Sequence, residues 1–268
     1  MYVLEVRSTV YVMSRDTAGG PIWARPEPRG RGPRFSRAQI ADAALAIADA
    51  DGIDAVSMRN VATRLGAGTM TLYNYVRTKD ELVALMDDAL MAEVLVPARE
   101  LPGDWREAVA TIARRTWAVL LRHPWAVATG RGGASLGPNA MRHFEQYLAV
   151  LAGTGLDSAA TFDLLAVVDS YVFGSVLRAG ESRRSATGQD PETVAAIIDY
   201  GLAQLRTGEF PHTAALLGDR DPRDPDAPRP PIDEQGLVDQ FERGLQAILD
   251  GAAARFVTPG MPNDASAR

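Results

Sequence analysis

The stretch Ser57–Lys79 holds the side chains with the clearest chemistry in this chain. It predicts two short helices joined by a turn of about three residues that Gly66 and Gly68 bound, which is the spacing of a helix-turn-helix. Ser57 can cap the first helix, because its hydroxyl can accept a hydrogen bond from a free backbone amide one turn later.

The second of these helices, expected over 69–76, has two unlike sides. Leu72 and Val76 face inward, and the opposite side carries Thr69, Met70, Tyr73 and Asn74. A short helix that is polar outside and braced from behind can enter the major groove of DNA, where base edges present distinct hydrogen-bonding patterns. The stretch therefore predicts sequence-specific binding to double-stranded DNA.

The run Leu65–Leu82 resembles the DNA-binding signature of the TetR (TetR/AcrR) family of transcriptional regulators. The resemblance is carried by the Leu72-Tyr73 pair, by Tyr75, and by Lys79 followed by Asp80-Glu81-Leu82. It implies a transcriptional repressor that binds a palindromic operator as a homodimer and is released by a small molecule. A transcriptional activator and a ligand-independent repressor are the alternatives.

Positions in the motif acquire expected roles from this resemblance. Arg59 stands where the family often reads a guanine, and Thr69, Met70 and Thr71 would lie nearest the bases, with Met70 suited to a thymine methyl group. Asn74 shares this polar side, while Tyr73, Tyr75 and Lys79 are expected to contact phosphates. Two alternatives stay open, namely that Tyr75 packs inward and that Arg59 pairs with Asp54.

The composition indicates a globular protein with several domains. The chain has 268 residues, 46% of them hydrophobic, and contains no cysteine, which excludes disulfides and thiol chemistry. No apolar run reaches the roughly 18 residues of a membrane span, and no signal peptide is recognisable. We therefore expect a cytoplasmic protein without a membrane partner.

The net charge of −6 is unevenly distributed. Residues 1–80 contain 11 basic and 8 acidic side chains, whereas the remainder contains 17 and 26. The positive part coincides with the expected DNA-binding region, where phosphates must be neutralised. Lys79 is the only lysine, which suggests that a compact ammonium is useful there, although chance retention would explain it too.

The residues that start and stop helices along the chain predict an all-α protein with a small head and a larger body. We expect an N-terminal arm over 1–34, flexible and starting at Met1 or Met13, and a three-helix DNA-binding head over 35–80. A helical body for ligand binding and dimerisation should cover 81–254, with a mobile loop over 207–232, and residues 255–268 should be disordered. Arginines of the arm could enter a minor groove or form a solvated tail.

The helix expected over 158–181 is apolar on nearly every side, so it must be covered all round. The resemblance implies that this helix and the last one form a four-helix dimer contact with their copies. Asp169 lies on the apolar surface and needs a partner, either an arginine across the dimer or a ligand.

The body is expected to bind an apolar or aromatic effector. The tetracycline-repressor-like part of the resemblance rests on Leu120-Leu121-Arg122-His123 and on the helix at 158–181, but glycines around Gly130 stand where that group has its metal-binding histidine. We expect no metal, no cofactor and no catalytic residues, because His123, His143 and His212 form no known pattern. Candidate lining residues, each also a plausible core residue, are Met86, Trp117, Trp125, Phe144, Tyr147, Tyr171 and Phe173.

Overall fold

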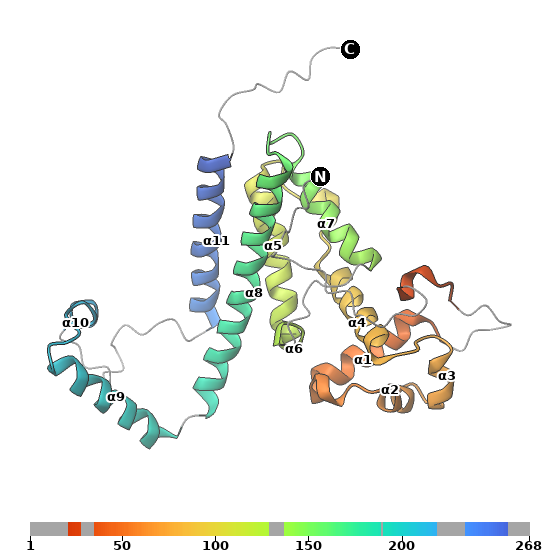
Figure 1. Cartoon of the computed structure of the whole chain (residues 1–268), viewed down its shortest axis with the longest axis horizontal. Coiled ribbons are helices and arrows are strands. Elements are labelled where there is room, and N and C mark those ends of the chain that lie inside the picture. Colours follow the sequence, from red (N-terminus) through yellow and green to blue (C-terminus); the bar gives the residue numbers. More distant parts are fainter. Residues whose placement is uncertain (1–20, 28–34, 129–136, 189, 219–233, 257–268) are drawn as a thin grey trace, which may run out of the picture. The chain divides into compact units, whose positions relative to one another are not determined.

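The computed structural model describes residues 21–27, 35–128, 137–188, 190–218 and 234–256, and every regular element in them is helical. The predicted all-α fold is confirmed (Figure 1). The described chain forms two compact units, one of residues 1–177 with 244–268 and the other of residues 178–243. The arginines of 29–34, the glycine-rich segment at 130–136 and residues 257–268 of the expected disordered tail lie outside the described residues, while residues 255 and 256 of that tail belong to the last helix.

The head of the first unit consists of three helices, and its boundaries follow from local sequence. They are α1 (Arg37–Asp51), α2 (Met58–Arg64) and α3 (Thr69–Tyr73) (Figure 1). The Ser36 side chain accepts from the Gln39 amide and the Gln39 side chain accepts from the Ser36 amide, which together form a capping box at the start of α1. Ile40, Ala44 and Val61 have 0% exposure, so α1 and α2 bury one side each.

The body of the first unit begins with α4, which also connects it to the head. Its helices are α4 (Lys79–Val94), α5 (Trp105–Arg122), α6 (Pro124–Ala128) and α7 (Pro138–Leu151). Single 3-10 turns precede α1 (η1, Ile22–Ala24), α2 (η2, Ile53–Ala55) and α5 (η3, Ala98–Glu100). The long helices α8 (Ser158–Gly188) and α11 (Glu234–Phe256) contribute residues to both units.

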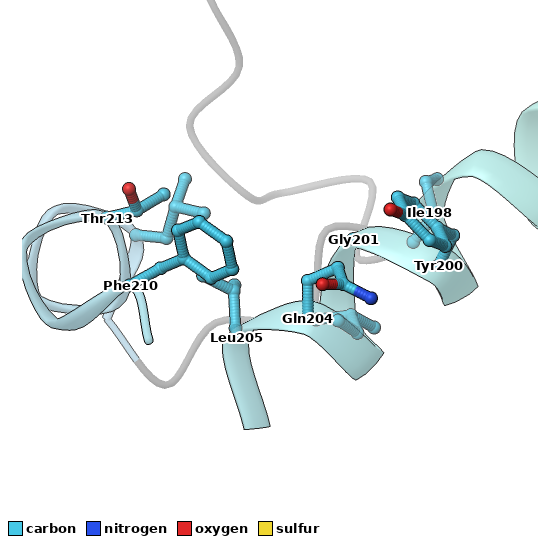
Figure 2. A pocket seen from close by; sticks show the side chains of 9 residues that line it. Ile198, Tyr200, Gly201, Gln204, Leu205, Phe210 and Thr213 are labelled. Carbon is cyan, nitrogen blue, oxygen red and sulfur yellow. The ribbon is translucent and has the colours of Figure 1, made fainter. Parts of the chain in front are cut away.

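The second unit contains α9 (Pro191–Arg206) and α10 (Pro211–Leu217). The sequence predicted a mobile loop over 207–232, and α10 corrects this for 211–217, because Pro211 takes the first helical position, where its missing N–H costs nothing. The side chains of α9 and α10 line a mostly apolar hollow of about 370 Å³ that includes Tyr200, Leu205 and Phe210 (Figure 2).

Much of the apolar surface of α8 is not covered within one protomer. The stretch Ser158–Ser182 is long and apolar enough to cross a membrane by length and composition, yet only 28% of its apolar window is buried. Leu164, Val168 and Val172 are buried, while Phe162 is 58% exposed and Val167 50%. This exposed apolar surface of α8 is of the kind that a partner is expected to cover.

A buried carboxylate joins the connecting helix α4 to α7. Asp88 is 4% exposed, and its Oδ1 accepts from the backbone amides of Asn139 at 2.8 Å and Ala140 at 3.2 Å. Its Oδ2 accepts from the Asn139 side chain at 3.0 Å. A Cβ atom at Gly137 would lie 2.1 Å from Asp88 Oδ1, so only glycine permits this approach. Asp88 therefore caps α7 from a different helix.

We predict that Asp88→Ala lowers the free energy of unfolding by about 2 kcal/mol, because it removes a cap and leaves buried donors unpaired. Urea unfolding at pH 7 measures this. The matched control is Asp104→Ala, which removes the exposed cap of α5 and should cost about 1 kcal/mol or less. Equal losses in the two variants would show that burial of the Asp88 contact adds nothing.

Candidate nucleic-acid interface

The turn between α2 and α3 is held by backbone hydrogen bonds from the Gly66 amide to the Thr63 carbonyl and from the Ala67 amide to the Ala62 carbonyl, and the start of α2 is held by side chains. The Ser57 hydroxyl accepts from the Asn60 amide at 3.1 Å, as predicted, and the Asn60 side chain donates to the carbonyl of Ala55 at 2.7 Å. Gly66 has a φ of +64°, in the left-handed region where a side chain would be strained. The turn therefore fixes the orientation of α3 relative to α2.

Helix α3 is shorter than the sequence predicted. We expected 69–76, but the helix ends at Tyr73, and the amides of Tyr75 and Val76 both bond to the carbonyl of Leu72 in a turn. Leu72 and Val76 are 0% exposed, in agreement with the expected inner side. The shortening matters because it changes where residues after Tyr73 point.

The outer side of α2 and α3 carries most of the expected DNA-contacting residues. Met70 is 77% exposed and Tyr73 43%. Arg59, Asn74 and Lys79 are exposed as well, and Thr69 and Thr71 are half-buried at the start of α3. In the described part of the chain, Arg59 makes no ion pair with Asp54, so its guanidinium remains available.

Tyr75 is placed differently from its expected position at a phosphate. Its side chain is only 5% exposed, because the chain turns inward after α3 ends. The structure thus matches the alternative that Tyr75 packs into the head, and we assign its ring to the core.

Lys79 occupies the first position of α4, where backbone amides have no partner within the helix. The Thr78 hydroxyl accepts from the Glu81 amide at 3.1 Å, which is half of a capping box. The other half is altered, since the Glu81 carboxylate accepts from the Arg77 amide at 2.7 Å and not from that of Thr78. A helix start with an exposed ammonium is suited to a DNA phosphate.

Two family models match most of the chain. "Bacterial regulatory proteins, tetR family" matches residues 40–86, which cover the head and half of α4. "Tetracyclin repressor-like, C-terminal domain" matches residues 97–256. The chain belongs to the TetR family. It is a DNA-binding transcriptional repressor of a ligand-responsive family, which confirms the function implied by the motif.

Individual members of the TetR family are similar to this chain over most of their length, which supports its membership of the family. The HTH-type transcriptional repressor DrrR1 of Streptomyces coeruleorubidus is 36% identical, and the match covers 86% of this chain and 82% of that protein. ActR from Streptomyces coelicolor has a similar structure, with a TM-score of 0.63 at 28% identity over 84% of this chain and 97% of that one. ActR in complex with actinorhodin matches with a TM-score of 0.62 at 29% identity, covering 83% and 97%.

The candidate effector-binding residues differ in burial and in the contacts that they make. Met86, Trp117 and Tyr147 are buried, Phe173 is half-buried, and Tyr171 packs against Gly244 of α11. Phe144 of α7 stacks on Phe162 of α8 with ring centroids 6.1 Å apart. Trp125 lies elsewhere, because its indole donates to Asp49 of α1 at 2.8 Å.

The contact of Trp125 belongs to a group of polar contacts around Asp49 and His123, called here the polar joint, that no sequence pattern predicted. His123 Nδ1 lies 2.7 Å from the same oxygen of Asp49, and His123 Nε2 lies 3.6 Å from Glu93 at the end of α4. The joint therefore connects α1 of the head with α4 and with the end of α5. Asp49 and His123 are 74 positions apart, and no local pattern relates them.

Buried titratable groups gather where α7 meets α8. Burial lowers the pKa of His143 to about 4, and its Nδ1 has no hydrogen-bond partner among the described residues. Burial also raises the pKa of the Asp169 carboxyl to about 6. The fully enclosed Tyr147 has a raised pKa from burial and from the nearby Asp169. His143, for which we expected no catalytic or metal-binding role, is thus a polar group in the aromatic part of the body.

We predict that Asp169→Asn stabilises the protein and that this gain grows as the pH rises from 4 to 7. Because the pKa of Asp169 is higher in the folded chain, folding retains a proton between about pH 4 and 6, so this carboxyl makes stability fall with rising pH. The gain at pH 7 should be about 1 to 3 kcal/mol.

Urea unfolding at pH 4, 5.5 and 7 measures this gain. His143 has the opposite pH dependence, but it is present in both proteins and cancels in the difference. Asp163→Asn, on an exposed part of α8, is the control and should change little at any pH. A gain for Asp169→Asn that does not vary with pH would contradict the raised pKa.

Proposed function

We propose that this protein binds a palindromic operator as a homodimer, with α3 of each protomer in a major groove. The observation that carries the proposal is the division of the α2–α3 unit into two sides. Leu72 and Val76 are fully buried, whereas Arg59, Met70 and Tyr73 face outward. Arg59 would read a guanine with two donors, and Met70 would contact a thymine methyl group.

The remaining outward residues divide into base and backbone contacts. Thr69 and Thr71 lie at the start of α3, which in this orientation is nearest the bases. Asn74 lies at the end of α3, close enough in sequence to Tyr73 to share its side of the groove. Tyr73 and Lys79 would hold the phosphates that fix the register of the head.

The dimer would form through α8 and α11. The exposed apolar side chains Phe162, Val167 and Leu177 of α8 support this, because a large apolar surface on a DNA-binding protein needs a cover. A second copy provides that cover together with the two-fold symmetry that a palindromic operator requires. The site of action would be the cytoplasm, where the bacterial DNA lies.

The effector would be an apolar or aromatic molecule bound in the body. Support comes from the buried ring of Tyr147 and the stacked rings of Phe144 and Phe162, and from the similar protein ActR, which has been solved in complex with actinorhodin. Tenfold release from DNA requires that the effector favour the released geometry by about 1.4 kcal/mol. The contacts of Asp88 and Asp49 would transmit this preference from the body to the head. Asp88 links α4 to α7, and Asp49 links α1 to the end of α5.

We predict different losses for two variants of the head. Arg59→Ala should weaken binding to the operator by about 1–3 kcal/mol while leaving random DNA nearly unchanged, because it removes a base contact. Lys79→Ala should weaken both DNAs about equally and reduce the salt dependence by about one ion, because it removes a phosphate contact.

Fluorescence anisotropy measures both effects with two duplexes. One is the sequence that the purified protein selects from random DNA, and the other is a scrambled duplex of equal length and composition. Loss of affinity for both duplexes in Arg59→Ala would contradict base reading. Failure of the wild type to select any sequence would contradict the proposed function.

We predict that Val167→Asp abolishes dimerisation without unfolding the protomer. Val167 is 50% exposed in one protomer, so a carboxylate there stays in water unless a second copy covers it. Sedimentation velocity should show a monomer, with helix content by circular dichroism unchanged. Ala118→Asp, on the exposed side of α5, is the control and should remain dimeric. A dimeric Val167→Asp variant would place the interface elsewhere.

A further inference from the structure

The carboxylate of Glu81 connects three parts of the DNA-binding head. Glu81 is 8% exposed and lies in the first turn of α4. Its Oε2 accepts from the Arg77 backbone amide at 2.7 Å and from the Arg25 guanidinium at 2.6 Å. Arg25 precedes α1 and is 56 positions from Glu81, so this ion pair brings a distant segment to the start of α4. The side chain of Arg25 is itself only 17% exposed.

A second arginine holds the same segment from the other side. Arg37, in the first turn of α1, is 8% exposed and donates through Nη1 to the carbonyls of Ile22 at 2.9 Å and Arg25 at 2.8 Å. The Glu27 carboxylate accepts from the Arg37 amide at 3.3 Å. Ile22 is 3% exposed, so the segment also has an apolar anchor. Residues 21–27, which we expected within a flexible arm, are thus packed on the head.

The contacts of Arg37 and the ion pair of Arg25 with Glu81 are shielded from water, so they are stronger than pairs on an exposed surface. Desolvation lowers the pKa of Arg37, and an arginine in such a place is held there by the carbonyls that it binds. Without Arg25, Glu81 would keep only the neutral Arg77 amide as a hydrogen-bond partner on the described chain, with the Arg37 guanidinium as the remaining nearby cation. The link from Arg25 to Glu81 is therefore positioned to control the turn that leads into Lys79.

We propose that residues 21–27 are a positioning element for DNA binding, in which Arg25 acts through Glu81 to fix the backbone of 77–79 and thereby the phosphate contact of Lys79. This inference rests on the proposed function, since it assigns the phosphate contact to Lys79. Arg25 itself points into the head and does not touch DNA. The working DNA-binding head thus begins at about residue 21.

A double-mutant cycle in the full-length chain tests this coupling. The variants are Arg25→Ala, Lys79→Ala and the double variant, with Arg25→Lys as a conservative rescue and Glu81→Gln as a second way to break the link. Arg99→Ala is the matched control, because Arg99 forms an exposed pair with Glu100. Anisotropy gives the Kd for the selected and scrambled duplexes over a range of salt, at a temperature well below every unfolding midpoint.

We expect Arg25→Ala to weaken binding to both duplexes about tenfold and to reduce the salt dependence by about one ion, as Lys79→Ala does. The double variant should bind no more weakly than Lys79→Ala alone. Arg25→Lys should recover part of the loss, Glu81→Gln should reproduce it, and Arg99→Ala should match the wild type. A purely stabilising contact would lower the unfolding midpoint of Arg25→Ala but leave its Kd and salt dependence unchanged.

Two results overturn the inference and are distinguishable from failure of the proposed function. If Lys79→Ala weakens binding but folded Arg25→Ala and Glu81→Gln bind normally, the coupling is absent while the proposed function stands. If the losses of Arg25→Ala and Lys79→Ala add, Arg25 acts independently of Lys79 and the inference fails. If Lys79→Ala binds both duplexes like the wild type, the phosphate contact fails, and the inference fails with it.

Discussion

The DNA-binding surface depends on packing that stabilises helix α3, which is too short to be stable alone. Helix α3 has five residues, far fewer than an isolated helix needs for stability in water. Its position is set by the burial of Leu72 within it and of Tyr75 and Val76 just after it. Any change that loosens this core moves the outward side chains relative to one another, and base reading tolerates little such movement.

Part-buried polar contacts then connect this core to the rest of the first unit. Asp49 binds His123 and Trp125, Asp88 caps α7, and Glu81 binds Arg25. Each contact joins elements far apart in sequence, and directional hydrogen bonds fix geometry more narrowly than apolar packing does. A ligand that shifts α5 or α7 must therefore shift α4 and α1 or break these bonds, and either response changes how the head is presented.

Local rules predicted much of this fold, because helix boundaries depend on neighbouring residues. Ser57 caps the helix that it was expected to cap, and Ser36 with Gln39, Thr78 and Asp104 cap theirs by the same local rule. The same rules could not place Tyr75, whose direction depends on where α3 ends. They also missed the joint of Asp49 with His123 and the packing of 21–27, because nothing in a short window shows which distant residues will meet. The family resemblance, carried by one motif, predicted the function well but said nothing of these contacts.

The most direct measurement of the central claim is methylation interference with dimethyl sulfate on the selected operator. The reagent methylates guanine N7 in the major groove and adenine N3 in the minor groove, so it separates the two grooves in one experiment. With α3 in the major groove of each half-site, guanine methylation should block binding at two symmetric positions about one helical turn or more apart. Interference only at adenines, or at a single unpaired position, would contradict a symmetric pair of helices reading the major groove.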